Sequence, residues 1–244
     1  MEQFFTTSEQ IQQIIKGFNL TKTLFVSSII IGAANIGKKS LARYLFPQAH
    51  MVSGKEQKEV EDALEAYDEL IITDFEMLSN QETLNFDNKR IIATANFTGN
   101  YSTIDTLFAF IYMMPSLKER LQDAMYIRDL FFQQAQKDLM VEKIPLDLSE
   151  FKMDLSSNSK SLKKAIYTFL TIRTMDIKDI EEAVYYYIMD HMAGNNAYKE
   201  YLGLYEKPLI KAGLKKYGSQ LQLSQVLGIN RNTLRKKIHE HAID

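Results

Sequence analysis

Cationic and amide side chains crowd one short stretch near the end of the chain. From Asn230 to Lys237 the sequence is NRNTLRKK. Arginine and asparagine can hydrogen-bond base edges in the major groove of DNA, while lysine and threonine can hold its phosphates. The candidate DNA-binding residues in this stretch are Asn230, Arg231, Asn232, Thr233, Arg235, Lys236 and Lys237.

A second stretch, from Gly32 to Lys39, has the residues of a phosphate-binding loop. Gly32, Gly37 and Lys38 fit the pattern G-x-x-x-x-G-K, placed between an expected strand and an expected helix. Backbone N–H groups of such a loop and the start of the following helix can cradle phosphate, and Lys38 would reach the outer phosphates. Lys39 occupies the position that usually carries Ser or Thr for magnesium. The alternative is a plain glycine turn between a strand and a helix.

Three apolar runs predict the strands that would carry this loop. Residues 24–31 form a continuous apolar run, typical of a strand buried on both faces. Residues 70–73 end at Asp74, and residues 90–95 end at Asn96. Strands that alternate with helices favour a parallel sheet covered by helices.

Helices are expected between and after these strands. A helix over residues 7–17 would begin with a capping box of Thr7 and Gln10, and one over residues 56–67 would turn Val60 and Tyr67 inward. The periodicity then predicts a long helix within residues 115–135 and helical structure from about residue 146 onward. Within this helical region we expect one helix over residues 158–170 and another over residues 179–192, followed by Gly194–Asn196 as a linker.

Two short amphipathic segments that meet at Gly228 predict a helix-turn-helix. The first, residues 220–227, would turn Leu223, Val226 and Leu227 to one side. The second would begin at Asn230, a good N-cap residue, and bury Leu234 and Ile238. A helix, a glycine turn and a basic second helix are typical of modules that place the second helix in the major groove.

Charge is distributed unevenly between the two parts of the chain. The 244 residues have a formal net charge of −2. Residues 207–244 contain 8 Lys/Arg and 2 Asp/Glu, a net of +6, so residues 1–206 carry −8. A basic block on an acidic body is the electrostatic footprint of a nucleic-acid-binding protein, although a solvated basic helix without a partner would look the same.

Composition excludes several classes of site. The sequence has no cysteine, which excludes disulfides, thiolate metal sites and cysteine catalysis. The start of the sequence lacks the basic region of a secretory signal, and the longest apolar run is too short to span a bilayer. We therefore expect a cytoplasmic, nucleoid-associated protein without a membrane partner.

The end of the chain resembles the Fis-type DNA-binding module, which the nucleoid protein Fis shares with NtrC-like bacterial regulators. The run GINRNTLRKK, from Gly228 to Lys237, is the specific part. The resemblance implies that the family's DNA-facing positions are Asn230, Arg231, Thr233, Arg235, Lys236 and Lys237. It adds Ser219 as a candidate, at the place where the family often has a small polar residue at the start of the first helix. It also implies a homodimer built by the helices upstream and double-stranded DNA as the partner.

Residues 5–175 resemble the AAA+ domain of NtrC-like enhancer-binding regulators. The similar segments, in order, are GAANIGKK, LIITDFEML, KRIIATAN, PSLKER and NSKSLKKAI. They resemble the phosphate loop, Walker B strand, sensor I strand, lid motif and sensor II helix. The resemblance implies ATP or ADP with magnesium, the latter through Asp74. The candidate nucleotide-binding residues are Gly32, Asn35, Gly37, Lys38, Lys39, Asp74, Asn96 and Lys160.

Departures from the AAA+ pattern predict weak or absent hydrolysis. Phe75 replaces the water-positioning glutamate, and Glu76, if the strand continued, would face the other way. Thr106 lies about where an arginine finger is expected, and Lys160 replaces the sensor II arginine. Only 36 positions separate Lys38 from Asp74, too few for the loop that contacts the alternative sigma factor.

The predicted fold class is α/β: a P-loop, AAA+-like parallel sheet, a helical lid and an all-α Fis-type domain. The predicted domains are residues 1–140, 141–176 and 177–244. The predicted protein is a DNA-binding transcriptional regulator with no enzymatic activity, no catalytic residues and no activation of the alternative sigma factor. An active ATPase that remodels a partner and a Fis-like architectural protein are the alternatives.

Overall fold

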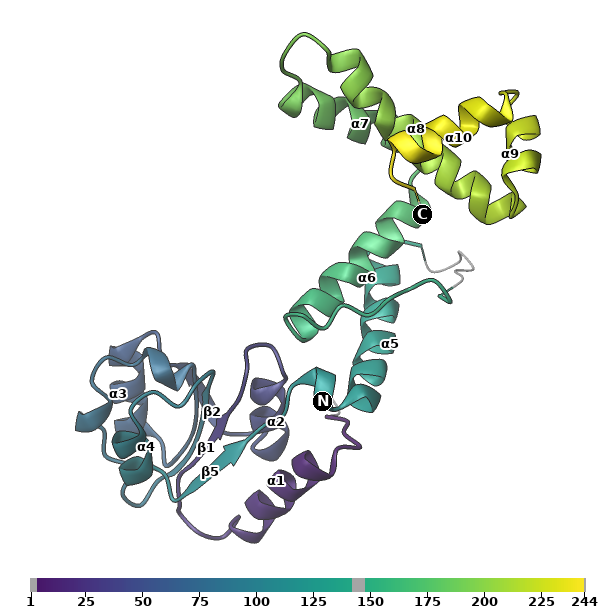
Figure 1. Cartoon of the computed structure of the whole chain (residues 1–244). Helices are drawn as coiled ribbons and strands as arrows, with labels where there is room; N and C mark the ends of the chain where they lie inside the picture. The colour runs from purple at the N-terminus through teal and green to yellow at the C-terminus, as the bar shows by residue number, and fades with distance from the viewer. Residues whose placement is uncertain (1–3, 142–147, 244) are drawn as a thin grey trace. The chain divides into compact units, whose positions relative to one another are not determined.

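A computed structural model describes residues 4–141 and 148–243 (Figure 1). The chain divides into two compact units, Met1–Thr174 and Met175–Asp244, which we describe separately. None of the helices in the described ranges is long and apolar enough to cross a membrane.

The first unit is built on a parallel sheet of five strands in the order β2-β3-β4-β1-β5. Within it, β1 pairs with β4 on one side and with β5 on the other, so Ile30 lies between Thr94 and Tyr112. The strands are β1 (Ser28–Ile31), β2 (His50–Ser53), β3 (Glu69–Thr73), β4 (Arg90–Ala95) and β5 (Phe110–Met113). This order places the carboxyl ends of β3, β4 and β1 side by side.

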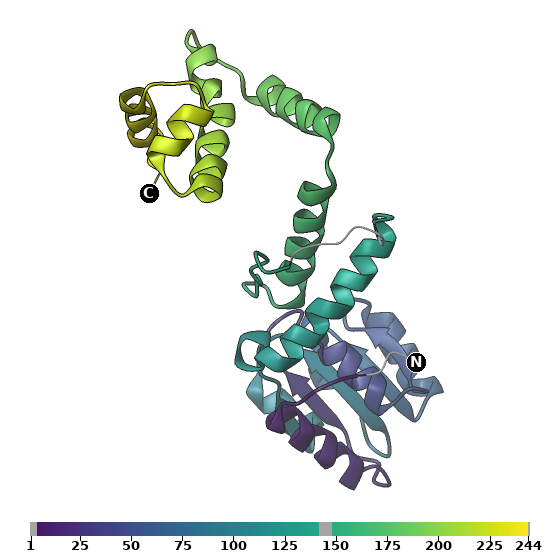
Figure 2. The ribbon, with the colours of Figure 1, turned by 90° about the vertical axis from the view of Figure 1, so that its right-hand side faces the viewer.

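Alternating side chains of the strands enter two separate hydrophobic cores. Ile29 and Ile31 of β1 pack with α3 (Gln57–Ala66) and α4 (Tyr101–Leu107), while Ile30 packs with α1 (Glu9–Leu20) and α2 (Lys38–Leu45). Figures 1 and 2 show these helix pairs on opposite faces of the sheet. Cover on both faces explains why the central strands are continuous apolar runs.

The strand predictions were confirmed in the centre of the sheet and incomplete at its edges. Residues 90–95 form β4, and β3 is one residue longer than predicted. The first strand begins at Ser28 rather than Leu24, because Leu24 and Phe25 are exposed in the loop before it. The edge strands β2 and β5 were missed, since their partly exposed side chains lack a buried-strand pattern.

Three helix details differ from the sequence prediction. The N-cap of α1 is Ser8, and α1 continues past Gly17 to Leu20. Instead of forming a capping box, Thr7 donates its backbone N–H to Asp123 Oδ1 over 2.8 Å. Tyr67 is exposed and stacks on His50 because α3 ends one residue before it.

The sheet is followed by two packed helices, α5 (Leu121–Asp138) and α6 (Ser159–Thr174). A short 3-10 turn, η3 (Leu117–Glu119), precedes α5 and occupies the start of the predicted helix. Residues 148–158 contain turns and irregular chain, so the prediction of helix there was wrong, and residues 142–147 lie outside the described residues. The apolar faces of α5 and α6 share one core centred on Leu162 and Ile166.

A buried ion pair joins the sheet to these helices. The Arg120 guanidinium donates to Asp123 Oδ2 over 3.0 Å, to the carbonyl of Pro115 over 3.2 Å and to the carbonyl of Ile36. Asp123, which is 0% exposed, also accepts from Thr6 and Thr7 of the N-terminal segment. Burial lowers the pKa of Arg120, and Asp123 opposes that shift.

Helices are the only regular secondary structure in the described residues of the second unit. Its helices are α7 (Ile177–His191), α8 (Ala197–Tyr217), α9 (Gln220–Val226) and α10 (Arg231–Glu240). Ile210 of α8, Leu223 of α9 and Leu234 of α10 form its core. Gly228 has a φ of +64°, the left-handed conformation that the turn between α9 and α10 needs. Val226, expected to face inward, is exposed because α9 ends there.

We predict that Asp123→Ala lowers the free energy of unfolding of the first unit by about 3–5 kcal/mol, because it leaves the Arg120 charge buried and unpaired. Urea denaturation monitored by circular dichroism measures this change. Asp129→Ala is the control, since Asp129 is exposed and its pair with the partly exposed Arg128 should contribute less than about 1 kcal/mol. Equal, small effects of both variants would contradict the importance of the buried pair.

Candidate functional site

The phosphate loop, residues 32–39, lies between β1 and α2, as the sequence predicted. Gly37 has a φ of +98° and Asn35 a φ of +61°, so the chain turns twice through the left-handed region. A Cβ at Gly32 would lie 2.5 Å from the carbonyl oxygen of Met114, which only glycine tolerates. Alternating right- and left-handed backbone of this kind forms concave anion-binding surfaces.

Lys38 is the buried cation of this loop. Its Nζ donates to the carbonyls of Gly32 and Ala33, each over 2.7 Å, and to Asn96 Oδ1 over 3.0 Å. Burial lowers the pKa of Lys38 to about 8, partly opposed by the carboxylates of Glu76 and Asp74. The ammonium group is therefore mostly charged at neutral pH, and its three N–H donors are all used within the protein.

Three polar residues follow the neighbouring strands at the same edge of the sheet. Asn96 follows β4, while Asp74 and Glu76 follow β3. Asn96 Nδ2 donates to Glu76 Oε1 over 2.5 Å, so Lys38, Asn96 and Glu76 form one connected chain. Ligands of parallel α/β sheets bind outside the carboxyl ends of the strands, where these groups lie.

The position of Glu76 corrects the sequence prediction. Asp74 has a φ of +53° and is followed by the 3-10 turn η1 (Phe75–Met77), so strand alternation stops at Thr73. Phe75 enters the hydrophobic core, and Glu76 points to Asn96 instead of away from it. Its second oxygen, Oε2, is buried without a hydrogen-bond partner among the described residues. That oxygen is a hydrogen-bond acceptor that the described residues leave unused.

The other predicted nucleotide residues are more exposed. Asp74 pairs with Lys55 at 3.9 Å and keeps part of its carboxylate open, which suits a ligand for a magnesium-bound nucleotide. Lys39 and Lys160 are exposed, and their ammonium groups have no ion-pair partner among the described residues. Lys160 follows Ser159, which contacts the loop. No cluster of three or more His, Asp or Glu side chains suited to a metal occurs in the ranges the structure describes.

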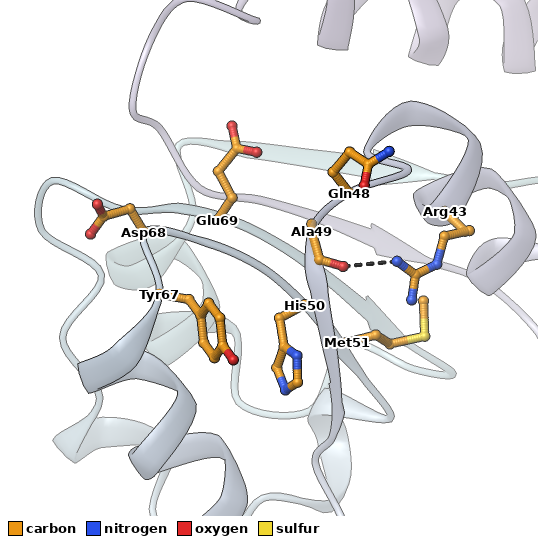
Figure 3. A pocket seen from close by; sticks show the side chains of 8 residues that line it. All are labelled: Arg43, Gln48, Ala49, His50, Met51, Tyr67, Asp68 and Glu69. Atoms are coloured by element: carbon orange, nitrogen blue, oxygen red, sulfur yellow. Dashed lines mark hydrogen bonds between the residues drawn. The ribbon is translucent and has the colours of Figure 1, made fainter.

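A separate hollow of about 510 Å³ lies at the opposite, amino-terminal ends of β2 and β3. Figure 3 shows His50 and Tyr67 face to face in it, with Arg43 bonded to the carbonyl of Ala49. Its charged side chains are already paired: Glu69 with Arg90, and Asp68 with Lys89. None of the predicted site residues lines it.

The candidate DNA-binding residues gather at α9 and α10. Asn230 caps α10 by accepting from the N–H of Asn232 over 2.8 Å, and Ser219 caps α9 by accepting from the N–H of Leu221 over 3.2 Å. Asn230 was predicted as an N-cap, whereas Ser219 was predicted only as a DNA-binding residue. In the structure both side chains fix the starts of their helices. Leu234 is buried beneath, so the opposite side of α10 faces solvent. The exposed candidates on α10 are Arg231, Asn232, Thr233, Arg235 and Lys236.

Lys237 differs from its neighbours on α10. Its Nζ forms an ion pair with Glu206 of α8, whose other oxygen lies 3.0 Å from His241 Nε2. Hydrogen bonds from Lys237 and His241 lower the pKa of Glu206. Sequence reasoning missed this partner, because Glu206 lies 31 positions before Lys237. Lys237 therefore fastens α10 to α8 in the free protein.

Comparison with known proteins finds relatives of this chain. Residues 202–241 match the family model "Bacterial regulatory protein, Fis family". A stretch of 52 residues is 46% identical to the DNA-binding transcriptional regulator NtrC of Azospirillum brasilense, covering 21% of this chain and 11% of that protein. The chain thus matches only a small part of that relative's length.

Solved structures of NtrX from Brucella abortus share the fold. The structure in complex with ATP has a TM-score of 0.55 at 16% identity and covers 100% of this chain and 70% of that one. Another NtrX structure has a TM-score of 0.56 at 15% identity, with coverage of 98% and 69%. The chain therefore has a P-loop, AAA+-like α/β fold and a Fis-family helix-turn-helix, which is the layout of an NtrC-like regulator.

We predict that the affinity for ATP falls about tenfold between pH 7 and pH 9, because Lys38 loses its positive charge as the pH rises through its pKa of about 8. Below that pKa the ammonium is present and the affinity should be flat. Titration calorimetry at pH 7, 8 and 9 measures the dependence. Lys38→Arg is the control, since it stays charged. The same pH dependence in both proteins would rule out Lys38 as the group responsible.

Proposed function

We propose that this chain, with its NtrC-like layout, is a sequence-specific DNA-binding transcriptional regulator of the bacterial cytoplasm and nucleoid. The observation that supports this most directly is the solvent-facing basic side of α10. Asn230 caps the helix and Leu234 anchors it, so Arg231, Arg235 and Lys236 are exposed to solvent. Lys236 forms only a surface ion pair with Glu240, at 3.7 Å, which DNA phosphate could replace. The second helix of such a module lies in the major groove, where arginine binds guanine and lysine binds phosphate.

Homodimerisation is the second part of the proposal. No side chain of α7 is buried in the single chain. Ile177, Ile180 and Val184 are exposed at helical spacing, next to the exposed Tyr185 and Tyr186. A helix with this much exposed apolar surface usually packs against a partner. A two-fold dimer through α7 and α8 would pair two α10 helices and favour a DNA site with two-fold character.

We predict that Arg235→Ala and Lys236→Ala each weaken DNA binding, because Arg235 and Lys236 face outward on α10. A lost phosphate contact should also reduce the slope of log affinity against log salt by about one. Fluorescence anisotropy on sites recovered by genome-wide mapping, with sedimentation to confirm the dimer, measures both effects. Lys58→Ala on α3 is the control, since Lys58 is an equally exposed lysine outside the second unit.

Unchanged binding in the double variant Arg235→Ala/Lys236→Ala would refute α10 as the recognition helix. The same titrations test the architectural alternative, in which DNA is bent with little base readout. That alternative requires nearly equal affinity for specific and random DNA at the same salt concentration.

The third part of the proposal assigns the phosphate loop to ATP or ADP, with magnesium held through Asp74. Lys38, the loop backbone and Asn96 are the groups that binding requires. Hydrolysis also requires an oriented water and stabilisation of charge at the γ-phosphate. Phe75 is in the core, Thr106 bonds to the backbone of its own helix, and Lys160 replaces an arginine. The nucleotide would therefore act as a ligand that stabilises one conformation of the first unit.

One observation favours a second candidate, an active ATPase that remodels a partner. Glu76 lies beside Asn96 with an unpartnered oxygen, so it has the chemistry to orient a water. No arginine is present between Arg90 and Arg120 to stabilise the γ-phosphate from the position expected for an arginine finger. We therefore favour slow turnover.

We predict that the chain releases phosphate from ATP at about 10⁻³ per second or less, the range of P-loop proteins that lack an arginine finger. We further predict that Glu76→Gln leaves this rate unchanged. A phosphate-release assay on the full chain, with Lys38→Ala as the background control, measures the rate. Rapid release that both substitutions abolish would establish the ATPase instead.

The last part of the proposal rests on how short the segment between Lys38 and Asp74 is. That segment consists of α2, β2, α3 and β3 and their short connections. This short segment supports the proposal that the protein lacks a sigma-contacting loop and does not activate the alternative sigma factor. Open-complex formation with that holoenzyme, ATP and a bound promoter would contradict this statement.

A further inference from the structure

The backbone carbonyls of the phosphate loop accept hydrogen bonds from other groups of the first unit. Lys38 binds the carbonyls of Gly32 and Ala33 from within the loop. The next three carbonyls accept from residues that follow the sheet: Ala34 from Asn158, Asn35 from Ser159, and Ile36 from Arg120. Five consecutive peptide carbonyls are thus held by side chains or by the start of α6.

Asn158 is the best placed of these donors. It is 7% exposed, with Nδ2 donating to the Ala34 carbonyl over 3.0 Å and Oδ1 accepting from the N–H of Leu117 over 3.0 Å. One amide therefore connects the phosphate loop, the turn before α5 and the start of α6. Ser159 adds two bonds to the Asn35 carbonyl, from its N–H over 3.1 Å and from its hydroxyl over 2.7 Å.

These contacts determine where the loop's donors point. In a planar trans peptide the C=O and the following N–H point in opposite directions. Fixing the carbonyls of Ala34 and Asn35 toward α6 therefore turns the N–H groups of Asn35 and Ile36 to the other side of the loop. An anion-binding loop needs its N–H groups gathered on one side.

We infer that Asn158 and Ser159 are positioning residues for the phosphates of the nucleotide, although they do not contact it. They hold the loop in its anion-binding conformation before the ligand arrives. Because α6 runs unbroken from Ser159 to Thr174, the last residue of the first unit, phosphate binding is linked to the position of that helix. The inference rests on the proposed function for its ligand and on the hydrogen bonds for its mechanism.

Two substitutions isolate the bond from Asn158 to Ala34. Asn158 has a φ of +54°, which aspartate and glycine tolerate better than most residues. Asn158→Asp keeps an acceptor for Leu117 but removes the donor to Ala34. Asn158→Gly removes both bonds without adding charge, so an effect common to the two variants is not caused by a new carboxylate. Ser157→Ala is the control, because Ser157 is an exposed serine in the same segment.

The experiment measures amide hydrogen exchange and ATP affinity on the full chain. Both Asn158 variants should speed exchange across residues 32–39 and weaken ATP binding, each about tenfold. Exchange in β3 and β4 should stay as in the wild type, a pattern that general destabilisation would not produce. Ser157→Ala should match the wild type in both measurements.

Unchanged amide exchange across residues 32–39 in both Asn158 variants would overturn the inference, whether or not the affinity for ATP changes. Faster exchange with unchanged ATP affinity would also overturn it, since the loop conformation would then not determine phosphate binding. If the wild-type chain binds no nucleotide, the proposed nucleotide function fails. The exchange result then decides by itself whether Asn158 holds the loop.

Discussion

The buried ion pair of Arg120 and Asp123 joins the parts of the first unit that a bound phosphate would need. Its two charges lie out of water, which costs free energy unless every hydrogen-bonding group is satisfied. Here Arg120 bonds to Ile36 of the phosphate loop, and Asp123 bonds to Thr6 and Thr7 ahead of α1. The pair therefore fixes the loop, the N-terminal segment and the start of α5 together.

The two proposed binding sites differ in how their positive charges are arranged. The phosphate loop has one buried cation, Lys38, and backbone N–H groups, which together suit a compact anion bound by directed hydrogen bonds. On α10, Arg231, Arg235 and Lys236 face solvent, which suits an extended polyanion that releases counterions. Lys237 is the exception among the cations of α10, since in the free protein it forms an ion pair with Glu206 of α8.

Local sequence determined the parts of the fold that could be predicted. Gly32, Gly37 and the buried run of β4 specify their own conformations, and Asn230 specifies the start of α10. The edge strands β2 and β5 were missed because pairing with the sheet, not their own apolar pattern, makes them strands. The place of Glu76 depends on a left-handed backbone at Asp74, and the contacts of Asn158 and Glu206 join residues far apart in sequence. The hydrophobic periodicity of a sequence is local and does not reveal contacts between residues so far apart.

Thermal unfolding of the full chain with and without millimolar ATP or ADP tests the central claim, that a nucleotide is a ligand of this DNA-binding protein, most directly. Ligand at about 100 times its dissociation constant should add about 2.7 kcal/mol of stability. The account predicts a midpoint raised by several degrees in the wild type and unchanged in Lys38→Ala. No shift with either nucleotide would mean that the loop is only a structural turn, and would contradict the account.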